Sequence, residues 1–160
     1  MNFEENLDSA DILILRALQR NAKLTIKELA SEASLSPSPT FERVKRLERD
    51  GYIRRYVAVV DAEKVGNGII VLCNVSLKKH SKEHMREFMD EVMKVDEVVE
   101  CYNTSGDYDY LMKLYVRDMQ HYRSIVMDSL GVLDCVGSLH SIFVIGEVKR
   151  SDSVPIWGRE

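Results

Sequence analysis

The side chains best suited to chemistry lie in one stretch, SPSPTFERVKRLERDG, which runs from Ser36 to Gly51. Phe41, Val44 and Leu47 recur at every third position, so the stretch is typical of a short helix with one apolar side. The residues opposite are Ser38, Pro39, Glu42, Lys45, Arg46 and Arg49, with Arg43 at the edge. Guanidinium and ammonium groups bind phosphates and base edges, so this pattern indicates entry into a DNA major groove. A solvated face whose basic residues complement the helix dipole would look the same.

Both ends of this helix are marked in the sequence. Ser36 is an N-cap candidate, and Pro37 falls at the first helical position, where its missing N–H costs nothing. Gly51 supplies a left-handed stop. Within the helix, Arg46 and Arg49 are expected to face straight out, and Thr40 falls on the buried side.

A zinc pattern, H-x-x-E-H, occurs at His80, Glu83 and His84. Both histidines would have to share one helix face to bind a metal. Ser81 is the expected N-cap of the helix that follows, which leaves His80 outside it. We therefore predict no metal site here.

Two carboxylates, Asp107 and Asp109, follow Gly106. Residues at i and i+2 point the same way along a strand. No His or Lys lies nearby in sequence, so acid–base catalysis is not indicated. The pair either supplies ordinary turn chemistry or captures the ammonium group of a ligand whose carboxylate binds N–H groups of the turn.

The composition is that of an ordinary globular protein of 160 residues, with 45% hydrophobic and 30% charged residues. No apolar run approaches a membrane span, and the N-terminus lacks the features of a signal peptide, so we expect a soluble cytoplasmic protein. Cys73, Cys101 and Cys135 are expected to be reduced, buried thiols.

The charge is distributed unevenly along the chain. The net charge is −4, yet residues 36–56 carry 6 Lys and Arg against 3 Asp and Glu, a local net charge of +3. Residues 61–160 carry 12 basic and 17 acidic residues. A basic stretch within an acidic protein favours one defined surface for DNA over nonspecific wrapping.

Two further helices precede the basic one. Asp8 caps the first, which ends at Asn21, and Thr25 with Glu28 forms a capping box for the second. Three helices within about fifty residues, the last two joined by a tight turn, predict a helix-turn-helix. The segment YIRRYVAVV, from Tyr52 to Val60, predicts a strand that would form a wing or a linker, where Arg54 and Arg55 could touch phosphate.

The remaining segments alternate in the order βαββαβ after a glycine-containing linker at 61–68. The predicted strands cover 69–77, 97–104, 108–116 and 136–148, and helices begin after Ser81 and Asp118. This order predicts a ferredoxin-like antiparallel sheet with both helices on one face. A second copy of the chain is expected to cover the other, apolar face.

Three segments resemble the Lrp/AsnC (leucine-responsive, or feast/famine) family of transcriptional regulators: LDSADILILRALQRNAKLTIKELA, LSPSPTFERVKRLERDGYI and SGDYDYLMK. The resemblance runs from Leu7 to about Ile156. It implies an α+β protein with a winged helix-turn-helix domain at residues 1–60 and a ferredoxin-like, RAM/ACT-like domain at 61–160. It also implies homodimers that assemble into tetramers or octamers.

The family's effector site lies at the hairpin between neighbouring dimers, so the resemblance implies an amino-acid effector there. The matching positions are Asn103, Thr104, Ser105, Gly106, Asp107, Tyr108 and Asp109. Two departures stand out. Ser34 occupies a turn position where the family usually has Gly, and Leu133-Asp-Cys-Val136 replaces the frequent Leu-Pro-Gly-Val. The second leaves the identity of the effector open.

The sequence therefore predicts a sequence-specific regulator of transcription that binds double-stranded DNA, needs no cofactor and responds to an amino acid through its assembly. The residues expected nearest the bases are Ser36, Ser38, Pro39, Glu42, Arg43 and Arg46, and those expected at the backbone are Lys45, Arg49, Arg54 and Arg55. Two alternatives stay open: a protein-interaction adaptor and a small-molecule enzyme on the ferredoxin-like domain, for which no catalytic set is found.

Overall fold

A computed structural model describes residues 7–157 of the chain. By its internal contacts the chain forms two compact units. The first takes in the residues up to Val59 together with those from Lys149 onward, and the second runs from Val60 to Val148. The C-terminal tail, predicted as part of a domain at 61–160, therefore groups with the first unit.

Hydrogen bonds to the first helix, α1 (Ser9–Arg20), explain why the C-terminal tail belongs to the first unit. The Arg16 guanidinium donates to the carbonyl of Ile156 at 2.6 Å. The Gln19 side-chain amide both donates to the carbonyl of Val154, at 3.1 Å, and accepts from its N–H, at 2.7 Å. Ile156 also packs against the apolar core of the first unit.

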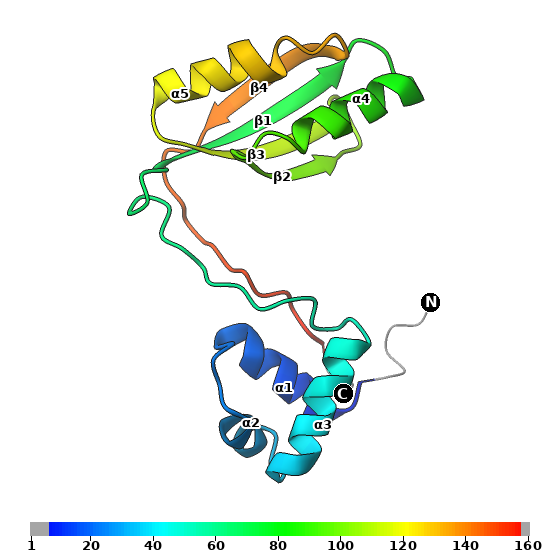
Figure 1. Ribbon diagram of the computed structural model, residues 1–160, viewed down its shortest axis with the longest axis vertical. Coiled ribbons are helices and arrows are strands. Elements are labelled where there is room, and N and C mark those ends of the chain that lie inside the picture. The colour runs from blue at the N-terminus through cyan, green and yellow to red at the C-terminus, as the bar shows by residue number, and fades with distance from the viewer. Residues whose placement is uncertain (1–6, 158–160) are drawn as a thin grey trace. The chain divides into compact units, whose positions relative to one another are not determined.

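The expected three helices are present in residues 7–59 (Figure 1). They are α1 (Ser9–Arg20), α2 (Ile26–Glu32) and α3 (Pro37–Arg49). The capping box at Thr25 and Glu28 is confirmed, and Asp8 forms a second capping box with Asp11. Ser36 is the N-cap residue of α3 with Pro37 at the first helical position, although the Ser36 side chain makes no capping hydrogen bond.

The helices pack around fully buried side chains from all three, namely Ile14, Leu29 and Leu47. Thr40 is also buried, as predicted, and its hydroxyl donates to the carbonyl of Ser36 at 3.0 Å. Phe41 differs from its expected place in the apolar stripe, because it is 45% exposed. Its ring lies 5.8 Å from the Lys45 ammonium, a distance suited to a cation–π contact.

Two residues of the first unit have a positive φ that its turns require. Gly51 has φ 79°, which confirms the left-handed stop after α3. Ser34, in the turn between α2 and α3, has φ 54°. A residue with a Cβ is strained in this region by about 1 kcal/mol or more.

Replacing Ser34 with glycine is therefore expected to raise the free energy of unfolding of the first unit by about 0.5–1 kcal/mol. The denaturation midpoint in urea measures this gain. Ser34→Ala is the matched control, because alanine keeps the Cβ and so the strain. Equal stabilisation by both substitutions would show that φ strain is not the cause.

The segment from Tyr52 to Val60, for which the sequence predicts a strand, does not form one. Its valines and aromatic residues favour an extended backbone, but a strand also needs a hydrogen-bonded neighbour. Within residues 7–157 no strand pairs with it. Val57 and Val59 are exposed, and among residues 7–157 the strand expected for the wing is absent.

The second unit has the predicted βαββαβ order (Figure 1). Its elements are β1 (Ile69–Leu77), α4 (Lys82–Val92), β2 (Val98–Asn103), β3 (Tyr110–Val116), α5 (Met119–Ser124) and β4 (Val136–Phe143). The π-helical turn η1 (Ile125–Leu130) continues α5. The strands pair antiparallel in the order β2-β3-β1-β4, which confirms the ferredoxin-like sheet. The last strand ends at Phe143, five residues earlier than predicted.

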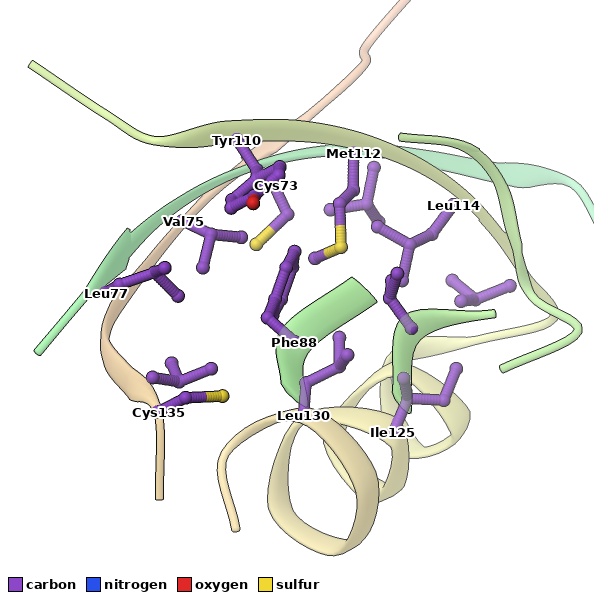
Figure 2. Close-up of a cluster of buried hydrophobic side chains, with 14 residues drawn as sticks. Cys73, Val75, Leu77, Phe88, Tyr110, Met112, Leu114, Ile125, Leu130 and Cys135 are labelled. Carbon is purple, nitrogen blue, oxygen red and sulfur yellow. The ribbon is translucent and has the colours of Figure 1, made fainter. Parts of the chain in front are cut away.

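Both helices pack on one face of this sheet around Phe88, which lies in the centre of the buried cluster (Figure 2). Cys73 and Cys135 are buried there as predicted, but Cys101 is exposed. Met89 and Met93 on α4 are 47% and 83% exposed, and Met119 on α5 is 55% exposed. These methionines therefore lie outside the buried cluster.

Among residues 7–157, no helix is long and apolar enough to cross a membrane.

Candidate DNA-binding and effector sites

The outer face of α3 carries the side chains that the sequence assigns to DNA. Ser38, Pro39, Glu42, Lys45 and Arg49 are all exposed there, as are Arg54 and Arg55 just after the helix. In helix-turn-helix proteins the second helix is the one that enters a major groove, and α3 holds that position in this unit.

Several of these charges already have partners within the chain. The Lys45 ammonium lies 3.3 Å from the Glu48 carboxylate, and the Arg49 guanidinium lies 3.0 Å from Asp50. Glu48 also accepts from the Tyr56 hydroxyl at 3.0 Å. Burial and this hydrogen bond raise the pKa of Tyr56 to about 12. These exposed ion pairs are weak in water, so phosphate can compete for the two cations.

Arg46, expected to face straight out, and Arg43, expected at the edge of the exposed face, both bond to acidic side chains of the same unit. Arg43 Nη1 lies 2.8 Å from Asp11 Oδ1 and 2.7 Å from Asp8 Oδ2, and Arg46 Nη2 bonds Asp11 Oδ2. We call these four residues the clasp. The sequence gives them as separate features of α1 and α3, and only the packing of the two helices brings them together.

Contacts within the clasp shift the pKa values of Asp8 and Arg43. The hydrogen bond from the Asp11 backbone N–H holds the pKa of the Asp8 carboxyl below its usual value, and the Arg43 guanidinium adds to this effect. Hydrogen bonds to Asp11 and Asp8 raise the pKa of the Arg43 guanidinium in turn. Arg43 therefore stays charged and the Asp8 carboxyl stays ionised at neutral pH.

The turn between β2 and β3 holds the seven positions that the family resemblance assigns to an effector. Gly106 has φ 116°, a conformation that glycine accepts readily. The Thr104 hydroxyl donates to the carbonyl of Tyr108 at 2.8 Å, and the Asn103 amide donates to the carbonyl of Asp109 at 2.9 Å. These bonds fix the turn, while Asp107 is exposed at its tip.

The two carboxylates of this turn have different surroundings. Asp109 is largely buried, its Oδ2 accepts from the Leu77 N–H at 2.8 Å, and its Oδ1 lies 2.9 Å from His80 Nδ1. It therefore ties the turn to the end of β1. His80 lies outside α4, and Ser81 caps that helix as predicted.

A helix-turn-helix with a basic face, joined to a ferredoxin-like unit with a preformed turn, defines a class of two-domain transcriptional regulators. Family models agree. One described as winged helix-turn-helix DNA-binding matches residues 7–54, and one described as Lrp/AsnC ligand binding domain matches residues 70–154. The chain belongs to the Lrp/AsnC family of DNA-binding transcriptional regulators, which are not enzymes.

Individual relatives support this membership over nearly the whole chain. The leucine-responsive regulatory protein of Escherichia coli K12 is 35% identical over 152 residues, which cover 95% of this chain and 93% of that protein. The transcriptional regulator NMB0573 of Neisseria meningitidis, solved as a complex with L-Met, is 37% identical with a TM-score of 0.90, over 93% of this chain and 96% of that one. An AsnC family regulator of Agrobacterium tumefaciens is 33% identical with a TM-score of 0.88, over 93% and 97% of the two chains.

Proposed function

We propose that this regulator reads DNA through the exposed face of α3 and answers to a free amino acid bound at the β2–β3 turn. The DNA-facing set is that of the sequence analysis, with Ser36, Ser38, Pro39, Glu42, Arg43 and Arg46 toward the bases and Lys45, Arg49, Arg54 and Arg55 toward the phosphates. The exposure of the α3 face supports this assignment. The local positive charge supports it too.

The observation that carries the effector proposal is the turn itself. Gly106 gives the chain a sharp bend, and Asp107 leaves an exposed carboxylate beside it. Such a turn offers N–H groups for the carboxylate of an amino acid and a carboxylate for its ammonium. The N. meningitidis relative was solved with L-Met, which makes an apolar amino acid the first candidate. Asp109 has its partners already, so Asp107 is the stronger candidate for the ammonium group.

The effector would act through assembly. The sheet face opposite the helices carries Leu72 paired with Ile142 and Tyr102 paired with Leu111. Tyr102 and Ile142 are 53% and 46% exposed, and a second copy of the chain would bury them. An amino acid changes the assembly only if it binds one assembly more tightly than another.

The test is a thermal-shift screen with L-Met, L-Leu and D-Met, with light scattering on the same samples. An effector at 100 times its Kd stabilises the protein by about 2.7 kcal/mol, so it stands apart from bystanders. Asp107→Asn is expected to weaken binding of the best ligand roughly 10–100-fold, because a charge-assisted hydrogen bond is lost. Asp96→Asn, another exposed aspartate of the second unit, is the matched control.

Three results would contradict the proposal. If none of the amino acids shifts the melting temperature, the effector is not an amino acid of this kind. If Asp96→Asn weakens binding as much as Asp107→Asn does, the turn is not the site. If light scattering and DNA affinity stay constant at saturating ligand, coupling through assembly is wrong.

A further inference from the structure

Asp11 occupies an unusual position for an aspartate, since its side chain is 1% exposed. Its Oδ1 accepts from Arg43 and its Oδ2 accepts from both Arg46 and the Asp8 N–H. A buried carboxylate needs such partners to remain charged. Two of these partners are Arg43 and Arg46 of α3. The Asp11 side chain on α1 therefore orients both guanidinium groups.

The two arginines of the clasp are held differently. Arg43 is bonded by two carboxylates and its side chain is 27% exposed. Arg46 is bonded by Asp11 through Nη2 and its side chain is 38% exposed. A guanidinium has five N–H donors on three nitrogens, so a carboxylate on one nitrogen leaves donors for a second acceptor. Arg46 can therefore keep its bond to Asp11 while it contacts a base or a phosphate.

We propose that Asp11 is a positioning residue of the DNA interface: it fixes the guanidinium of Arg46 for base contacts before DNA arrives, while Arg43 fastens α3 to α1. This rests on the proposed DNA-reading face of α3. A side chain that is already ordered loses less conformational entropy on binding. The guanidinium group is planar and its N–H donors have fixed directions, so binding depends on its orientation more than it does for a lysine ammonium group.

The charge of the clasp separates this role from a purely structural one. Asp8 and Asp11 balance the charges of Arg43 and Arg46. Asp11→Asn removes one negative charge close to the DNA-facing helix, so binding to DNA of arbitrary sequence should hold or strengthen. Specific binding should weaken, because Arg46 is no longer oriented. A structural role would weaken both, since a loosened α3 presents every contact poorly.

The experiment uses the full chain, a duplex that the wild-type protein selects from a random pool, and a shuffled duplex of equal length and composition. Asp11→Asn is expected to lower affinity for the selected duplex about tenfold without weakening the shuffled one. Arg46→Ala should reduce the preference, the ratio of the affinities for the selected and the shuffled duplex, about 10–100-fold. Asp11→Asn added to Arg46→Ala should then change the preference no further. Asp8→Asn is the matched control: it removes the same charge but leaves Arg43 bonded to Asp11 and leaves the bond between Asp11 and Arg46 intact, so it should keep the wild-type preference.

A measurement on the wild-type protein covers the case in which Asp11→Asn does not fold. The Nε–H relaxation of arginine side chains reports their order in the absence of DNA, and Arg46 should be clearly more ordered than the exposed Arg54.

Four outcomes would contradict this account. Equal mobility of Arg46 and Arg54 would overturn the proposal, as would equal weakening of binding to both duplexes by Asp11→Asn. Loss of DNA preference in Arg46→Ala with no effect of a folded Asp11→Asn would refute the positioning role while leaving the DNA-reading face intact. If the wild-type protein selects no duplex, the DNA-reading face fails, and the positioning role with it.

Discussion

Leu47→Ala is expected to lower the free energy of unfolding of the first unit by about 2–5 kcal/mol, and to abolish DNA binding at temperatures where the second unit is still folded. Leu47 is fully buried on α3 and belongs to the same core as Ile14 and Leu29. Alanine there loses the burial of the removed carbon atoms and leaves a cavity between the helices. The recognition helix is thus weakened from its inner side, without any change to a DNA-facing residue.

Hydrogen exchange, followed by mass spectrometry, measures this effect unit by unit. Peptides from α1–α3 should lose protection, while peptides from the sheet should keep it. Leu13→Ala is the matched control, since Leu13 lies on α1 with 40% of its surface exposed, and it should change stability by less than about 1 kcal/mol. If both substitutions lower the free energy of unfolding of the first unit equally, burial does not determine how much Leu47 contributes to stability.

Local signals in the sequence account for what could be predicted of the fold. The capping box at Thr25, the proline after Ser36 and the glycine at position 51 act within a few residues of their own positions. Each is legible without knowledge of the rest of the chain. The βαββαβ order follows from the same kind of local pattern, which is why it is confirmed.

Features that depend on distant residues were missed or misjudged. Asp11 lies in the first turn of α1, where an acid complements the helix dipole, but its arginine partners lie 32 and 35 positions away on α3. Gln19 binds the tail 135 positions away. The segment from Tyr52 to Val60 has the composition of a strand and lacks a neighbour. Such pairings are set by tertiary packing, and periodicity within one element cannot reveal them.

The DNA-facing residues also divide into those that local sequence predicts and those that depend on tertiary packing. The exposure of Lys45 and Arg49 follows from their position around α3, so the sequence alone predicts it. Arg46 is partly buried, with 38% of its side chain exposed, because it pairs with Asp11 of another helix. The signal that could have indicated its partner was the pairing of two acids, Asp8 and Asp11, in the first turn of α1, with two arginines three residues apart on α3.

Phe88→Ala is expected to lower the free energy of unfolding of the second unit by about 3–5 kcal/mol, the largest loss predicted for this chain. Phe88 is fully buried, and its ring centre lies 4.6 Å from that of Tyr110 on β3 (Figure 2). Phe88 therefore packs α4 against the sheet, within the same core as Val92 of that helix. Alanine would leave a cavity between α4, η1 and the strands, and would also lose the aromatic pair.

Met89→Ala tests whether burial is the cause, because Met89 is the next residue of α4 and is 47% exposed. It should change the urea midpoint of the second unit by less than a third of the Phe88→Ala effect. Hydrogen exchange again separates the units: Phe88→Ala should expose the strands before the helices α1–α3 lose protection. Simultaneous loss in both units would show that they unfold as one cooperative block. The effector-binding unit and the DNA-binding unit would then have one common free energy of unfolding. A ligand bound at the turn would stabilise the helix-turn-helix against unfolding without any change in assembly.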